Sequence, residues 1–159
     1  MARIRKIMVT DVPTLKKEAK IFDAAKLLAS DENGCVVILD GRKPVGIVTE
    51  HDILSRFVSK NKSMNEKVSR IMSAGMTFMT PDVKLDEAVE IIDTKKFRKY
   101  PVIENEELAG LATKRAIIQA VSDNLKLHRS IQNIVLILFA AFEFFVLVLF
   151  NYFPPGGSR

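Results

Sequence analysis

Hydrophobic and polar positions form two similar patterns along residues 1–125. After a short entry segment, counted as a strand, each pattern has apolar residues that recur every three or four positions, as on one helical face. The positions of this face are Phe22, Ala25, Leu28 and Ala29 in the first pattern and Leu85, Ala88, Val89 and Ile92 in the second. The sequence therefore predicts two amphipathic helices, each with one face directed toward a core.

Two short apolar runs follow each of these helices and predict strands. The runs 35–39 and 45–49 are separated by the turn residues Asp40-Gly41. Glu104-Asn105 takes the same place between the runs 101–103 and 108–113, so each pair is typical of a β-hairpin. A second helix is then indicated, with the apolar positions Ile53, Leu54, Phe57 and Val58, or Ile117, Ile118 and Val121.

The two patterns are copies of one another. Ile7-Met8 recurs 64 positions later as Ile71-Met72, and Gly46–Thr49 recurs as Gly110–Thr113 at the same spacing. Further correspondences, at a spacing of 63, join Leu15 to Phe78 and 23–28 to 86–91. Two copies are too few for a solenoid. We therefore predict an α+β fold in which two pseudo-symmetric repeats, 1–62 and 63–125, share one core. Each has the order strand, helix, strand, strand, helix.

The duplication and the heptapeptide 46–52 together resemble a tandem pair of cystathionine-β-synthase (CBS) domains. The sequence Gly-Ile-Val-Thr-Glu-His-Asp matches that family's motif of Gly, two hydrophobic residues, Thr, two variable residues and Asp. The resemblance covers roughly residues 3–125. It implies a disc-shaped pair with two clefts that bind AMP, ADP or ATP, with S-adenosylmethionine as the alternative ligand.

The resemblance also implies a set of ligand contacts. The motif residues Thr49 and Asp52 would hold phosphate and ribose, and Ile47 would line the same wall. Residues of the second repeat would form the opposite walls, namely Ser69, Met72, Ala74, Phe97, Arg98, Lys99 and Tyr100. Elementary chemistry agrees, since a glycine such as Gly46 lets backbone approach a ligand and a carboxylate accepts from two vicinal hydroxyls.

Six of these residues also have a simpler interpretation. The spacing of Thr49 and Asp52 is close to that of a capping box, in which both side chains serve the start of a helix. Arg98 and Lys99 belong to the basic run 95–99, which is also typical of a solvated surface. Phe97 and Met72 have the composition of core residues.

The second repeat departs from the motif. It reads Gly110-Leu111-Ala112-Thr113-Lys114-Arg115-Ala116, so that an alanine replaces the ribose carboxylate. We therefore expect one competent cleft and one weak or empty cleft.

Composition narrows the function classes. The sequence contains two histidines, which are far apart, and no phosphate-binding loop or HExxH motif. Cys35 is the single cysteine, which excludes an intrachain disulfide and fits a reducing compartment. We expect no enzyme, no catalytic cofactor and no metal. The net charge of +5 arises within residues 1–130 and is compatible with a solvated surface or with a site for phosphates.

The C-terminal part, 126–159, has a different composition. After a basic linker at 126–130, the stretch 131–153 predicts a hydrophobic helix long enough to cross a bilayer, ending in the interfacial aromatics Tyr152 and Phe153. Glu143 would cost about 2.5–3.5 kcal/mol at mid-membrane, which the apolar residues outweigh. Basic residues before the span predict a cytoplasmic CBS pair. The alternative is a cytoplasmic protein with a helix buried in a soluble oligomer.

The sequence thus favours a nucleotide-sensing regulator at a membrane, expected as a homodimer that acts on a transporter, channel or enzyme. The alternative is a ligand-free structural module whose C-terminal helix mediates assembly. Nucleic-acid binding by 95–99 is disfavoured, because no aromatic stacking platform is interleaved with the basic residues.

Overall fold

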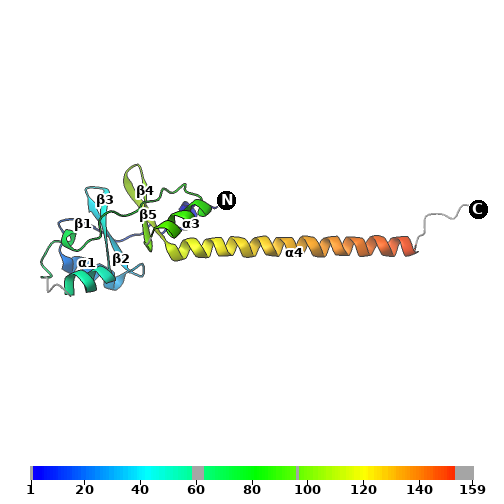
Figure 1. The fold of residues 1–159 in the computed structure, drawn as a ribbon, viewed down its shortest axis with the longest axis horizontal. Coiled ribbons are helices and arrows are strands. Elements are labelled where there is room, and N and C mark those ends of the chain that lie inside the picture. Colours follow the sequence, from blue (N-terminus) through cyan, green and yellow to red (C-terminus); the bar gives the residue numbers. More distant parts are fainter. Residues whose placement is uncertain (1, 59–62, 96, 153–159) are drawn as a thin grey trace, which may run out of the picture. The chain divides into compact units, whose positions relative to one another are not determined.

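The computed structural model describes residues 2–58, 63–95 and 97–152. They belong to two compact units, Met1–Ala120 and Val121–Arg159, which are considered separately (Figure 1). The first unit contains repeat 1, repeat 2 as far as Ala120, and the strands of the described residues.

Repeat 1 has the predicted order of elements. These are β1 (Thr14–Lys16), α1 (Ile21–Ser30), β2 (Cys35–Asp40), β3 (Lys43–Thr49), the short α2 (Glu50–Asp52) and the π-helical η2 (Ile53–Val58). The strands form a sheet in the order β1-β2-β3, with β1 parallel and β3 antiparallel to β2. On η2, Ile53 and Phe57 pack against the core while Leu54 is exposed. The side chain of Val58 lies outside the described residues.

Repeat 2 follows the same order with one difference. Its elements are the 3-10 turn η3 (Val68–Arg70), α3 (Leu85–Thr94), β4 (Lys99–Glu104), β5 (Glu107–Thr113) and the start of α4 (Lys114–Tyr152). The strand expected before α3 is reduced to one parallel bridge between Met79 and Val102, so the sheet has the two strands β4 and β5.

The spacing between equivalent positions is 64 in the helices as well as in the motif. Helix α1 begins at Ile21 and α3 begins at Leu85. The face predicted for α3 is confirmed, with Leu85, Ala88 and Ile92 buried. The face predicted for α1 is right at Leu28 and one position out at Phe22 and Ala25, because α1 was matched to α3 at a spacing of 63. Its buried residues are Ile21, Ala24 and Leu28, whereas Phe22 and Ala29 are exposed.

The same spacing corrects the match of Leu15. This residue pairs with Ile38 in the parallel ladder of repeat 1, as Met79 pairs with Val102 in repeat 2. Leu15 therefore corresponds to Met79 and not to Phe78.

Each repeat is completed by the N-terminal segment of the other repeat. We call residues 2–9 the first leading segment. Val9 donates its N–H to the Leu111 carbonyl at 2.9 Å and accepts from the Leu111 N–H at 2.8 Å. Ile4 also donates to the Val83 carbonyl at 2.9 Å. The first leading segment therefore binds to repeat 2.

The second leading segment, residues 66–73, binds to repeat 1 in the equivalent way. Ser73 donates its N–H to the Ile47 carbonyl at 2.8 Å and accepts from the Ile47 N–H at 3.1 Å. Val68 donates to the Ala19 carbonyl at 2.7 Å. The exchange of leading segments gives the pair its pseudo-twofold arrangement.

The central strand β2 is buried on both faces, as expected for a strand covered on each side. Val36 and Ile38 lie in the cluster formed with α1 and the second leading segment. Cys35 packs with Ile47 of β3 and with Leu111 of β5. The two repeats therefore share a core, as the sequence predicted.

The second unit is the continuation of α4. This helix runs without a break from Lys114 to Tyr152, so residues 126–130, expected to be a linker, are helical. Nearly all of the apolar side chains between Ile131 and Val148 are exposed. Within Lys114–Val148 lies a window of mean hydropathy 2.3 that is 0% buried, and its length and composition alone would suit a membrane span. The side chain of Tyr152 and the whole of Phe153 lie outside the described residues.

Candidate functional site

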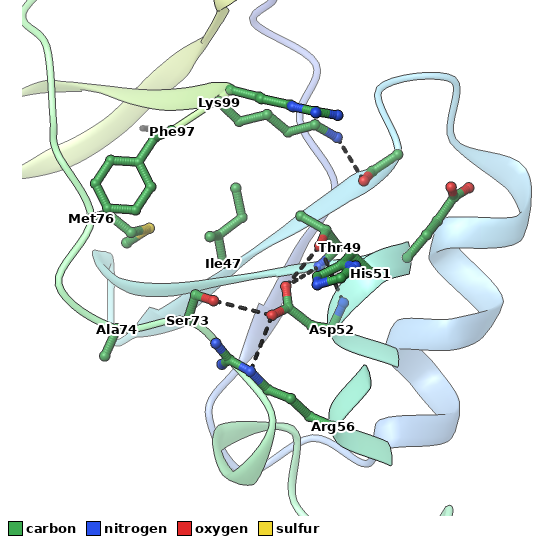
Figure 2. A pocket seen from close by; sticks show the side chains of 13 residues that line it. Ile47, Thr49, His51, Asp52, Arg56, Ser73, Ala74, Met76, Phe97 and Lys99 are labelled. Carbon is green, nitrogen blue, oxygen red and sulfur yellow. Dashed lines mark hydrogen bonds and ion pairs between the residues drawn. The ribbon is translucent and has the colours of Figure 1, made fainter. Parts of the chain in front are cut away.

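A cleft of about 550 Å³ lies between the two repeats. Its volume is within the range of about 300–1,000 Å³ that is usual for small-molecule sites. Repeat 1 contributes Gly34, the end of β3, α2 and Arg56, whereas residues 73–76 and 97–99 form the remaining walls. Figure 2 shows Phe97 and Met76 on the opposite side of the cleft from Asp52.

The Asp52 carboxylate is the buried charge at the floor of the cleft, with 4% of the residue exposed. Its Oδ2 accepts from the Thr49 N–H at 2.9 Å and from the Thr49 hydroxyl at 2.7 Å. The Asp52 N–H donates back to Thr49 Oγ1 at 3.3 Å. These reciprocal bonds are the capping box that the spacing allowed.

The other oxygen of Asp52 faces groups from elsewhere in the chain (Figure 2). Asp52 Oδ1 accepts from the Ser73 hydroxyl at 3.1 Å and forms an ion pair with Arg56 Nε at 3.5 Å. The same guanidinium donates through Nη1 to the carbonyls of Ile71 and Met72, at 3.1 and 2.9 Å. Arg56 thereby connects η2 of repeat 1 to the second leading segment.

Lys99 crosses the cleft from the second repeat. Its ammonium group donates to the carbonyls of Asn33 and Gly34, the latter at 2.6 Å. The ammonium also lies 3.4 Å from where a Cβ on Gly34 would be, and Gly34 has a φ of +58° that favours glycine. Lys99 is therefore engaged with the backbone of repeat 1, whereas Arg98 beside it is exposed.

The structure brings together seven of the ten residues predicted for the site. Those that line the cleft are Ile47, Thr49, Asp52, Ala74, Phe97, Arg98 and Lys99. Their roles as ligand contacts stay predictions. Ser69, Met72 and Tyr100 do not line it. Ser69 lies in η3, and Tyr100 is fully buried with its hydroxyl donating to the Phe97 carbonyl at 2.9 Å. Burial raises the pKa of the Tyr100 hydroxyl.

Met72 is a packing residue. Its Cγ lies 2.9 Å from where a Cβ on Gly46 would be. Gly46 therefore leaves room for the close approach of Met72. Gly46 does not line the cleft, and its expected role in approaching a ligand stays a prediction. The sequence carried a signal for this contact, because Met8 and Gly110 recur at the same spacing and are also in contact.

Six residues of the cleft were not predicted, among them Arg56, Ser73 and Met76; the others are Gly34, Glu50 and His51. A comparison of the repeats at the spacing of 64 would have indicated Arg56 and Ser73. The counterpart of Arg56 is Ala120, and the counterpart of Ser73 is Val9. At the same spacing, Ala116 is the counterpart of Asp52. The three polar groups that meet in the first cleft are thus replaced together by apolar residues.

At the equivalent positions of repeat 2, half of the capping arrangement is present. Thr113 Oγ1 accepts from the Ala116 N–H at 3.1 Å. Lys114 donates its ammonium to the Ile92 carbonyl at 3.3 Å, at the end of α3. Arg115 is exposed beside them. The part of the chain that the structure describes contains no group of three or more His, Cys, Asp or Glu side chains able to hold a metal ion.

Comparison with known proteins agrees with the internal duplication. A family model described as "CBS domain" matches residues 4–59 and 68–123. An uncharacterised protein of Methanopyrus kandleri is 30% identical over 117 residues, which span 72% of this chain and 58% of that protein. An inosine-5'-monophosphate dehydrogenase of Thermoplasma acidophilum is 33% identical over 113 residues, or 70% of this chain and 22% of the enzyme.

Two solved structures share the fold and contain ligands. CBSX2 in complex with AMP is 20% identical, with a TM-score of 0.66 over 77% of this chain and 98% of that one. The CBS domain pair of protein MJ0100, in complex with 5'-methylthioadenosine and S-adenosyl-L-methionine, is 21% identical, with a TM-score of 0.68 over 77% and 98% of the two chains. At these identities the likeness concerns the fold.

Proposed function

Because the chain belongs to the CBS domain family, we propose that its first cleft binds an adenine nucleotide and that the protein is a regulator without catalysis of its own. The fold is of the kind that holds AMP in one relative and S-adenosyl-L-methionine in another. A relative that is an enzyme matches this chain over 22% of its own length, which is compatible with a regulatory module attached to a separate catalytic part.

The observation that carries the proposal is the contrast between the walls of the cleft. Asp52 offers a carboxylate to ribose hydroxyls on one side. Met76 and Phe97 offer apolar and aromatic surface to a purine on the other, and Ile47 lies between the two sides. A site of a few polar groups within an apolar pocket is the usual form of a small-molecule site.

The charges of the cleft favour AMP, ADP or ATP over S-adenosylmethionine. Arg98 and His51 are exposed at the rim, where a phosphate can reach them. A guanidinium attracts phosphate strongly, whereas S-adenosylmethionine carries a sulfonium cation next to its ribose. Lys99 contributes positive charge from a fixed position, since its ammonium is held by backbone carbonyls.

Calorimetric titration of the full chain with AMP, ATP and S-adenosylmethionine tests the proposal. We expect one nucleotide per chain, weaker binding in Phe97→Ala and Arg98→Gln, and unchanged binding in the matched control Arg115→Gln, which removes an exposed arginine beside the second cleft. The proposal fails if none of the three ligands binds, or if the two cleft variants bind as the wild type does.

We further propose that the apolar part of α4, residues 131–148, anchors the CBS pair to the cytoplasmic face of a membrane. The support is an exposed helix of membrane-spanning length. The basic residues Lys126 and Arg129 precede it, as the positive-inside rule requires of a cytoplasmic flank. Carbonate extraction of membranes from cells tests the anchor, and release of the protein into the supernatant contradicts it.

The alternative is that α4 assembles copies of the chain and that the cleft serves no ligand. The same exposed apolar side chains favour it, because they would also be covered in a helical oligomer. The two proposals differ in solution. An assembly helix gives a defined detergent-free oligomer that carbonate releases, whereas an anchor stays in the membrane pellet. A homodimer, and regulation of a transporter, channel or enzyme, are compatible with either.

A further inference from the structure

Both oxygens of the Asp52 carboxylate are already engaged within the protein. Oδ2 accepts two hydrogen bonds from Thr49. Oδ1 accepts one from Ser73 and also lies in an ion pair with Arg56. Only 6% of the Asp52 side chain is exposed. A ribose bound by this carboxylate must therefore replace a contact that is already present.

The contacts on the two oxygens differ in kind. Those on Oδ2 are short, at 2.7 and 2.9 Å, and join residues three positions apart at the start of a helix. Those on Oδ1 are longer, at 3.1 and 3.5 Å. They come from the second leading segment and from the partly exposed side chain of Arg56. The contacts on Oδ1 are the easier ones to exchange.

The equivalent positions of repeat 2 provide an internal comparison. At the spacing of 64, Asp52 corresponds to Ala116, Arg56 to Ala120 and Ser73 to Val9. Thr113, the counterpart of Thr49, is retained together with its bond to the helix start. The capping residue therefore persists where the carboxylate is lost, whereas both partners of Oδ1 are absent. Arg56 and Ser73 thus belong with the carboxylate and not with the cap.

We infer that Arg56 and Ser73 occupy the place of the ribose hydroxyls on Asp52 while the cleft is empty, and that nucleotide binding exchanges their contacts for the 2'- and 3'-hydroxyls. The inference rests on the proposed nucleotide function. Arg56 and Ser73 are positioning residues that hold the buried carboxylate in place. They also set the strength of ribose recognition, because every ligand must displace them.

The exchange has a second consequence, because Arg56 also holds the Ile71 and Met72 carbonyls. Ser73 follows directly and is bonded to Ile47 in the wall of the cleft. If Arg56 loses its ion pair with Asp52, its guanidinium has fewer fixed contacts with which to hold residues 71–73. Ligand binding is thereby linked to how firmly residues 71–73 are held against repeat 1.

The test compares AMP with 2'-deoxy-AMP, which lacks one of the two hydroxyls. The full chain is titrated calorimetrically as wild type, as Arg56→Met and as Arg70→Met. Arg70 is the control, since it is an arginine of the second leading segment that pairs with Glu66 and does not line the cleft. The ratio of the two dissociation constants cancels any general attraction between a cation and the phosphate.

We expect the ratio of the 2'-deoxy-AMP constant to the AMP constant to rise roughly fivefold in Arg56→Met, the equivalent of one net hydrogen bond. We expect no change in Arg70→Met. Ser73→Ala removes the other contact on Asp52 Oδ1 and should also raise the ratio. This variant provides the test if Arg56→Met does not fold. Amide hydrogen exchange in the wild type should become faster at Ile71–Ser73 when AMP is added.

The outcomes separate the inference from the proposed function. If the wild type binds AMP but the ratio is unchanged or lower in both variants, the inference is overturned and nucleotide binding stands. Slower exchange at Ile71–Ser73 on adding AMP also contradicts it. If the wild type binds neither nucleotide, the proposed function fails, and the inference fails with it.

Discussion

The side chain of Met72 packs directly against the α-carbon of Gly46, where the Cγ and Cβ atoms would lie 2.9 and 3.2 Å from an added Cβ. Gly110 stands in an equivalent position against Met8, but its nearest neighbour is the carbonyl oxygen of Val9, 2.6 Å from an added Cβ. The glycine that begins each motif therefore makes room for the leading segment that packs against that repeat.

These contacts predict unequal costs for two equivalent substitutions. Gly46→Ala should lower the free energy of unfolding by about 1–3 kcal/mol, the usual cost of overpacking, and Met72→Ala in the same chain should recover part of it. Gly110→Ala should cost more, because a backbone carbonyl cannot rotate away as a methionine can. Urea denaturation measures both. Equal costs, or no rescue by Met72→Ala, would contradict the packing role of Met72.

The two motif threonines provide a second matched pair. Thr49 donates to the Asp52 carboxylate and accepts from the Asp52 N–H, whereas Thr113 makes only the equivalent of the second bond. We expect Thr49→Val to cost about 1.5–3 kcal/mol, as for a bond to a charged group, and Thr113→Val about 1 kcal/mol, as for an ordinary cap. Thermal unfolding of the two variants should show the larger decrease in melting temperature for Thr49→Val.

Alkaline solutions should destabilise the protein through Cys35. Burial raises the pKa of this thiol above its ordinary value of 9.0, although Lys99 acts in the opposite direction. Between the unfolded and folded pKa the native state retains a proton that the unfolded state releases. Stability is therefore complete below the ordinary value and falls as the pH rises above it. Cys35→Ala should remove this part of the pH dependence in thermal unfolding between pH 8 and 10.

Glu143 gives a test of the proposed anchor that is independent of the cleft. If residues 131–148 cross a bilayer, replacing this carboxylate by leucine should favour insertion by about 3 kcal/mol. A membrane-insertion assay on the full chain should then show a larger inserted fraction for Glu143→Leu. Leu138→Ala is the control, since it changes the apolar area without changing charge. An inserted fraction that Glu143→Leu leaves unchanged would favour the soluble assembly.

Much of the fold could be predicted because each repeat is specified locally. The hairpins follow from apolar runs around Asp40-Gly41 and Glu104-Asn105, and the order of elements follows from periodicity. The register of α1 could not be read with the same certainty, because Asp23 and Asp86 suggest a spacing of 63. The structure places Ile21 opposite Leu85, and this buries Ile21 in place of Phe22.

The cleft was predictable where its residues are neighbours in the sequence. Thr49 and Asp52 lie three positions apart, and a motif can hold them together. Ser73 reaches Asp52 only because the second leading segment returns to repeat 1, a contact between residues 21 positions apart. Its hydroxyl has no local pattern that would mark it. Arg56 is closer, but its role depends on the carbonyls of Ile71 and Met72, which sequence periodicity does not place.

The exchange of leading segments also constrains the order in which contacts can form during synthesis. Val9 is translated early, but its partner Leu111 is made near the end of the second repeat. The first repeat can obtain the second leading segment as soon as residue 73 emerges, whereas the first leading segment must wait for β5. The paired arrangement of the two repeats can therefore be completed only after residue 111 has been made, when most of the chain already exists.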